Sequence, residues 1–289
     1  VSQYEALITF YLDILEEMHR QGVFPSMVKP NSAYFEQYGL DGFRALAKII
    51  SEYRKAGHLV LLDAKRGDID RTNRAYARAA FEELGADALT VNPYMGVESL
   101  EPFMEYLSEG RGIYVLARTS NPGAKDFQEK LIDGEALYER VVRSFSQQGR
   151  AGVGFVMGGT SPSSMQTILQ KLQKSNQPTS LLIPGFGAQG ASVEQVMGLF
   201  RDFPETRLLH RLNASSSINY AWQNAQTKPE EYASAAVHAL RDLTSKCKLK
   251  DKFYLVLFVF FSNFLISDEI KIGIGSCLDQ DFPQPIWHQ

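Results

Sequence analysis

The residues with the clearest capacity for chemistry lie in segment 63–68, which reads DAKRGD and follows the apolar run 59–62. That run predicts a short buried strand, and the alternation of side chains along a strand places Asp63 and Lys65 on the same face. Asp68 follows just beyond a glycine that permits a turn. Acidic and basic groups at the carboxyl end of a strand are typical of the chemistry of α/β folds. A solvated loop with surface ion pairs explains the segment equally well, so the rest of the sequence must decide between the two interpretations.

A second lysine, Lys29, lies near the end of the neighbouring predicted strand, residues 23–30. In a barrel the ends of adjacent strands converge on one cavity, so we expect Lys29, Asp63 and Lys65 to meet there. Each opposite charge favours ionisation of its neighbour, and all three groups are therefore expected to be charged. Such a cluster destabilises a substrate anion placed beside the carboxylate. It also stabilises a carbanion that develops beside Lys65, which can then protonate it.

Two further loops offer groups that could bind a substrate. Residues 185–190 read GFGAQG between a predicted strand and a helix, and backbone N–H groups in such a turn can bind phosphate. A plain tight turn explains this stretch equally well. Residues 119–121 read TSN at the end of the predicted strand 112–118 and offer hydroxyl and amide groups. Taken alone, this tripeptide is more often an ordinary capping turn.

These loops are positioned by a regular alternation of strands and helices at roughly thirty-residue steps, the length of βαβ units. The predicted strands cover residues 23–30, 59–62, 88–92, 112–118, 153–157, 180–184 and 207–212. The predicted helices cover residues 3–20, 40–54, 71–84, 98–107, 134–148, 163–172, 192–200, 216–223 and 229–243. So long an alternation favours an α/β fold of the (β/α)8 type, a TIM barrel, over an open sheet. The barrel is one strand short, and because the chain opens on a helix, the missing strand is the first.

Residues 247–289 do not continue this pattern, so we expect a barrel domain at 1–246 followed by an atypical apolar C-terminal tail. Within the tail, residues 253–261 read FYLVLFVFF. This run is too short for a membrane-spanning helix, and a membrane anchor is not expected. A buried strand, an interface segment and an aggregation-prone segment all remain open.

The composition is that of an ordinary globular protein, with 289 residues, 44% hydrophobic and 22% charged, and a net charge of −3. This charge gives no basic surface for nucleic acid. The cysteines, Cys247 and Cys277, lack the spacing of metal ligands, and the five histidines form no metal-binding motif. No signal peptide is visible. We therefore expect a cytoplasmic protein without a bound metal.

The segment from Asp63 to Thr72 resembles the signature of the orotidine 5′-phosphate decarboxylases. Four further stretches, VKPNSAYFEQYG, LTVNPYMGVESLEPF, RTSNPGAKDFQ and PGFGAQG, resemble the longer-chain bacterial subfamily, type 2, over about residues 5–245. The resemblance implies a TIM barrel that converts orotidine 5′-monophosphate to UMP and carbon dioxide in the last step of de novo pyrimidine biosynthesis. It also implies a homodimer, and a reaction that uses neither a metal nor an organic cofactor.

The resemblance assigns catalytic roles to four residues. Lys65 matches the proton donor to C6 of the pyrimidine, and Asp63 matches the carboxylate that faces the substrate carboxylate. Lys29 matches the lysine that contacts the ribose and pairs with that aspartate. Asp68 matches a residue that reaches across the dimer interface to the partner's ribose, and Thr72 matches a second residue of this kind.

The resemblance also assigns substrate-binding roles to the loops. Ser120 matches the hydroxyl that reads the pyrimidine, and Gln189 matches a glutamine that bridges base and phosphate. Gly185 and Gly187 belong to the glycine-rich turn beside the phosphate. Ser216 occupies the position of an arginine that grips the phosphate in the family.

Three departures from the family leave alternatives open. The family's first strand ends in an aspartate that holds the ribose, and it has no counterpart in this sequence. The C-terminal tail, in turn, has no counterpart in the family. The third departure is Ser216. A catalytically impaired or inactive homologue, or a gene fragment acting as a ligand-binding or interaction protein, is one alternative. Another is a different phosphate-binding barrel enzyme with the same charged array, although the TSNPG and PGFGAQG loops disfavour it.

Overall fold

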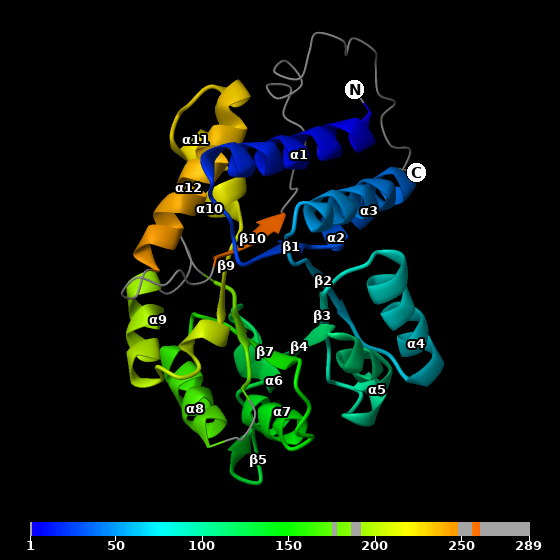
Figure 1. Ribbon diagram of the computed structural model, residues 1–289. Coiled ribbons are helices and arrows are strands. Elements are labelled where there is room, and N and C mark those ends of the chain that lie inside the picture. The colour runs from blue at the N-terminus through cyan, green and yellow to red at the C-terminus, as the bar shows by residue number, and fades with distance from the viewer. Residues whose placement is uncertain (1, 175–177, 186–191, 248–255, 261–289) are drawn as a thin grey trace, which may run out of the picture.

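The computed structural model describes residues 2–174, 178–185, 192–247 and 256–260, and Figure 1 draws the remaining residues as a grey trace. Within the described ranges the strands form a parallel barrel that helices surround on the outside (Figure 1). None of the helices in these ranges has the length and apolar character needed to cross a membrane.

The barrel contains eight strands in the spatial order β1-β10-β9-β8-β7-β4-β3-β2. Neighbours in this order pair in parallel. Parallel bridges between Val28 and Val60 and between Asn31 and Asp63 close the ring between β1 and β2. The strands that follow chain order are β1 (Met27–Pro30), β2 (Leu61–Arg66), β3 (Ala88–Val91), β4 (Gly112–Arg118), β7 (Val153–Met157), β8 (Leu181–Ile183) and β9 (Arg211–Ala214). The predicted (β/α)8 architecture is thereby confirmed.

The eighth strand, β10 (Val256–Phe260), comes from the C-terminal tail. Its backbone pairs on one side with β1, where Lys29 is opposite Val259, and on the other side with β9, where Ala214 is opposite Phe258. Among the described residues no strand precedes β1. β10 thus lies between β1 and β9, the place where the missing first strand is expected (Figure 1). This strand comes from the opposite end of the chain.

Helices follow most of the strands and cover the outer face of the barrel. The first, α1 (Gln3–Gln21), begins at a capping box between Ser2 and Glu5 and ends at Gly22, whose φ of 62° is left-handed. The other α-helices are α2 (Ala33–Glu36), α3 (Gly39–Lys55), α4 (Asp70–Arg78), α5 (Glu101–Met104), α6 (Ala124–Phe127), α7 (Leu137–Ser146), α8 (Pro162–Gln173), α9 (Val193–Leu199), α10 (Ser216–Asn219), α11 (Ala221–Asn224) and α12 (Tyr232–Lys246). Shorter helical turns are η1 (Ala79–Glu83), η2 (Glu98–Leu100), η3 (Glu105–Glu109), η4 (Phe200–Asp202), η5 (Arg207–Leu209) and η6 (Pro229–Glu231).

Several predicted elements have other boundaries in the structure, among them β1, which begins at Met27 rather than at residue 23. Two further cases have a clear local cause. The helix predicted from residue 134 begins at Leu137, because residues 131–136 form a hairpin of β5 (Leu131–Ile132) and β6 (Glu135–Ala136). Its two-residue turn, Asp133-Gly134, has positive φ at both positions, 54° and 82°, which is the geometry that an Asp-Gly pair favours. The strand predicted from residue 207 begins only at Arg211, because η5 precedes it.

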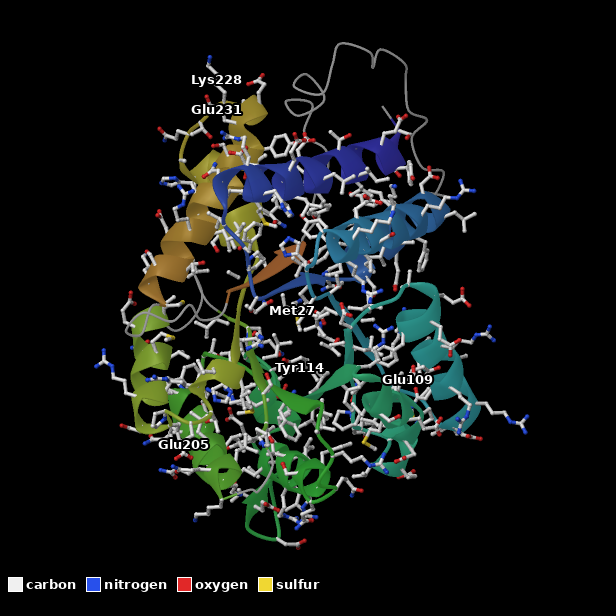
Figure 2. The ribbon with its side chains drawn as sticks, viewed as in Figure 1. Met27, Glu109, Tyr114, Glu205, Lys228 and Glu231 are labelled. Carbon is white, nitrogen blue, oxygen red and sulfur yellow. The ribbon has the colours of Figure 1, made fainter. Side chains whose placement is uncertain are left out.

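The barrel interior is built in layers, and its lower layer is apolar. Six strands each contribute one side chain to it, and these are Met27, Leu61, Ala88, Tyr114, Val156 and Leu182. Figure 2 shows Met27 and Tyr114 within the ring of strands. Because side chains alternate along a strand, the next inward residue lies two positions further toward the carboxyl end. On β1, β2 and β3 these residues are Lys29, Asp63 and Thr90, so a polar layer lies above the apolar one.

Candidate active site

A buried carboxylate between two lysines forms the centre of the polar layer. Lys29 Nζ on β1 donates to Asp63 Oδ2 on β2, and the side chains of the two residues are 5% and 9% exposed. Lys65 Nζ lies 2.6 Å from the other carboxylate oxygen, Asp63 Oδ1. The three residues predicted to converge, here called the lysine–aspartate cluster, therefore do so at the carboxyl end of the barrel strands.

Thr90 on β3 is a member of this site that the sequence analysis missed. Its hydroxyl donates to Asp63 Oδ1 over 2.9 Å and accepts from the backbone N–H of Lys65, also over 2.9 Å. It is 1% exposed. The only sequence signal for it is the period of two on β3, which places residues 88 and 90 on the inward face.

The electrostatics of the cluster keep Asp63 ionised. Burial alone would raise the pKa of the Asp63 carboxyl, but the charges and hydrogen bonds of Lys29 and Lys65 outweigh this effect and hold the pKa well below its usual range. Burial lowers the pKa of the Lys29 ammonium, and the attraction of Asp63 opposes this shift. The result is a carboxylate that stays charged although it lies out of water.

The backbone at the end of β2 is bent so that Lys65 lies at the mouth of the barrel. Lys65 has a φ of 47°, which is uncommon for a residue with a side chain, and the pairing with β3 shifts register between Leu62 and Arg66. Gly67 then passes so close to β3 that an added Cβ would lie 2.9 Å from the backbone oxygen of Asn92. The Lys65 side chain is 47% exposed, so its ammonium faces both Asp63 and the solvent-accessible mouth.

Asp68 and Thr72 lie outside this buried cluster. Asp68 Oδ1 accepts the backbone N–H of Ile69, and the backbone oxygen of Asp68 accepts from the buried Asn73 side chain over 2.6 Å. Asn73 Nδ2 also donates to the backbone oxygen of Ser99, which fixes the loop against η2. Thr72, in the first turn of α4, and Ile69 are exposed to solvent. The structure thus places these residues on an accessible surface beside the mouth.

Ser120 and Gly185 come together at the ends of β4 and β8. Gly185 has a φ of 96°, and an added Cβ there would lie 3.0 Å from the Ser120 Cβ, so the position requires glycine both sterically and conformationally. Gly187 and Gln189, the other residues predicted in this turn, lie outside the described residues.

Ser216 follows β9, the neighbour of β8, and is the first residue of α10. Its side chain is exposed. Asn213, on β9 itself, is 9% exposed, and its Oδ1 has no hydrogen-bond partner among the described residues. Polar side chains therefore line this side of the mouth, and a bound molecule could satisfy the Asn213 oxygen.

A closed barrel of parallel strands with an ionised, lysine-flanked carboxylate at its carboxyl end has the architecture of a TIM-barrel enzyme. Comparison with known proteins identifies the family within this class. Residues 12–199 match the family described as orotidine 5′-phosphate decarboxylase / HUMPS, and the chain belongs to this family.

Individual relatives agree with the family match. The orotidine 5′-phosphate decarboxylase of Roseiflexus castenholzii is 38% identical over 218 residues, which is 74% of this chain and 75% of that protein. The enzyme of the same name from Christiangramia forsetii is 40% identical over 248 residues, covering 84% and 85%. Among solved structures, the OMP decarboxylase of Leishmania donovani has a TM-score of 0.67 at 29% identity, over 86% of this chain and 90% of that chain. UMP synthase from the same organism has a TM-score of 0.69 at 31% identity, over 86% and 52%.

Proposed function

We propose that the protein decarboxylates orotidine 5′-monophosphate to UMP and carbon dioxide, the last step of de novo pyrimidine biosynthesis. The observation that carries this proposal is the lysine–aspartate cluster, with a buried carboxylate kept ionised by one buried lysine and one accessible lysine. This arrangement suits a reaction that removes one negative group and delivers one proton at the same place. Family membership supports the same reaction.

The mechanism follows from the charges. A substrate carboxylate placed beside Asp63 is repelled by it, and the repulsion ends when the bond from C6 to the carboxyl carbon breaks and carbon dioxide leaves. The electron pair of that bond remains on C6, where the Lys65 ammonium stabilises it. Lys65 then transfers a proton to C6, which forms the C–H bond of UMP, and regains a proton from solvent. Lys29 keeps Asp63 ionised and in place, and we assign it a contact with the ribose.

The loops at the mouth are proposed to hold the rest of the substrate. Ser120 would read the pyrimidine, and the backbone of the turn containing Gly185 and Gly187 would bind the phosphate. Gln189 would bridge base and phosphate. Ser216 offers the phosphate a neutral hydroxyl from the start of α10, a weaker partner than an arginine.

A homodimer is the proposed assembly, with Asp68 and Thr72 reaching the ribose in the partner's site. Apolar side chains exposed near this loop support an interface, because Ile69 is 60%, Tyr94 88% and Met95 49% exposed. Sedimentation equilibrium at micromolar concentration tests this assembly, and a monomer under these conditions would contradict shared sites. We also propose a cytoplasmic location and a division of the chain into residues 1–246, which supply most of the barrel, and a tail, 247–289, which adds β10 to it.

The deciding experiment is a decarboxylation assay with the purified full chain, following the loss of orotidylate absorbance. We expect turnover in the wild type and turnover reduced by about 10²-fold or more in Lys65→Ala. The control is Arg143→Lys, which alters the ion pair between Arg143 on α7 and Glu135 on β6, whose arginine is 46% exposed. Binding of UMP without turnover would instead indicate the inactive, ligand-binding homologue.

A further inference from the structure

The end of β4 carries a buried arginine that the proposed mechanism does not use. Arg118 is 5% exposed, and its guanidinium makes hydrogen bonds to three different segments. Nε and Nη2 donate to Glu129 Oε1 over 3.0 and 2.8 Å. Nη1 donates to the backbone oxygen of Thr119 over 3.0 Å and to the hydroxyl of Thr160 over 3.2 Å. One side chain therefore connects the loop after β4, the segment after α6 and the loop after β7.

Ser120 lies at the centre of these connections. The Thr160 hydroxyl, which accepts from Arg118, donates in turn to the backbone oxygen of Ser120 over 3.1 Å. The backbone N–H of Gly158 donates to the backbone oxygen of Arg118 over 2.7 Å, and an added Cβ at Gly158 would lie 2.7 Å from the Ser120 Cα. Together with Gly185, these contacts hold the Ser120 backbone between the ends of β4, β7 and β8.

A second set of hydrogen bonds fixes the residue before Ser120. The backbone N–H of Thr119 donates to Gln128 Oε1 over 2.7 Å, and Gln128 Nε2 donates to the Thr119 hydroxyl over 3.0 Å. Because Gln128 directly precedes Glu129, the short segment after α6 binds both Thr119 and Arg118. The loop that carries Ser120 is thus held from both sides.

We infer that Arg118 is a positioning residue, which acts through Thr160 to set the Ser120 hydroxyl for recognition of the pyrimidine ring. This inference rests on the proposed function, because it assumes that Ser120 faces the base. The chemistry requires arginine: the planar guanidinium offers five donors in a fixed fork, whereas the three donors of a lysine ammonium leave a single atom and cannot reproduce the four bonds made by Nε, Nη1 and Nη2. Arg118 itself does not touch the reacting atoms.

The test compares two ligands that differ in the base. Calorimetric affinities for UMP and for ribose 5-phosphate, which lacks the pyrimidine, are measured for the wild type, Arg118→Lys and Thr160→Val. Misplacement of one neutral hydrogen bond to the base should weaken UMP binding roughly 3- to 10-fold. Ribose 5-phosphate binding should stay within about twofold of the wild type, since about 0.4 kcal/mol corresponds to that factor. Thr160→Val keeps the side-chain shape and the arginine, so it tests the inference even if Arg118→Lys fails to fold.

Two further variants complete the comparison. In Ser120→Ala, adding Arg118→Lys should cause no additional loss of UMP affinity, because the arginine acts through that hydroxyl. Arg143→Lys, in the partly exposed pair between α7 and β6, should bind both ligands as the wild type does. Equal losses for both ligands, or additive losses in the double variant, would show a merely structural role and overturn the inference. If the wild type binds UMP no more tightly than ribose 5-phosphate, the proposed function itself is overturned.

Discussion

Replacing Asp63 by asparagine tests the reasoning about the buried cluster most directly. Asparagine has nearly the same shape and can still accept from Thr90, so the change removes the charge and the second acceptor oxygen, which Lys29 uses. Lys29 then remains as a buried cation without its partner, only 5% exposed. The variant should lose decarboxylase activity, because the group that repels the substrate carboxylate is gone, and it should also lose stability.

The size of the stability loss follows from the burial of the pair. Removing one partner of a buried ion pair typically costs about 3–5 kcal/mol, because the other charge is left uncompensated. Lys29 can limit this cost by releasing its proton, and neutralising a lysine of ordinary pKa at pH 7 costs about 4.6 kcal/mol. We therefore expect Asp63→Asn to lower the free energy of unfolding at neutral pH by about 3 to 4.6 kcal/mol.

The stability loss of Asp63→Asn should also depend on pH. In the variant, the pKa of Lys29 is lower in the folded than in the unfolded state, so the unfolded state binds more protons and stability rises with pH. Near pH 9.5 neutralising a lysine costs only about 1.2 kcal/mol, and the difference from the wild type should shrink toward this value. In the wild type, the depressed pKa of Asp63 gives stability that is present above about pH 4 and is lost as the pH falls further.

Urea unfolding followed by circular dichroism at the two pH values measures both effects. The matched control is Asp87→Asn, directly before the amino end of β3. The Asp87 carboxylate accepts from the backbone N–H of Val60 and pairs with Arg54 and Arg111. Because Arg54 is 40% and Asp87 19% exposed, water reaches this cluster, and the control should cost clearly less than Asp63→Asn. A loss below about 1 kcal/mol in Asp63→Asn, or one that does not shrink at high pH, would refute the assignment of a buried, charged Lys29.

Three further outcomes are expected. Lys65→Ala should reduce turnover about 10²–10⁴-fold or more while the protein still unfolds like the wild type, since the side chain is 47% exposed; a loss below tenfold would place the proton donor elsewhere. Ser216→Arg should raise kcat/KM roughly 30- to 1,000-fold for the nucleotide but little for the unphosphorylated nucleoside, and equal gains would mean that residue 216 does not face the phosphate. A chain truncated after Cys247 lacks β10 and leaves one edge of β1 and one edge of β9 unpaired, so its melting temperature and activity should fall; an unchanged melting temperature would show that β10 contributes nothing to the barrel.

The sequence alone determined the strand–helix alternation and the face on which Asp63 and Lys65 lie, because both follow from the periodicity of neighbouring residues. It also located the TSN and glycine-rich loops, which have recognisable local composition. Local signals failed where a short turn competed with a longer pattern, as at Asp133-Gly134, where a hairpin replaces the first turn of a predicted helix.

The tertiary structure decided what no local pattern encodes. Thr90 belongs to the site only because strand pairing brings it to Asp63, which lies on another strand. Arg118 is linked to the Ser120 backbone only through Thr160, which loop packing brings from the end of β7. The position of β10 is decided in the same way: an apolar run predicts a strand but not its neighbours. The backbone groups on the facing edges of β1 and β9 need hydrogen-bond partners, and here a strand from the far end of the chain supplies them.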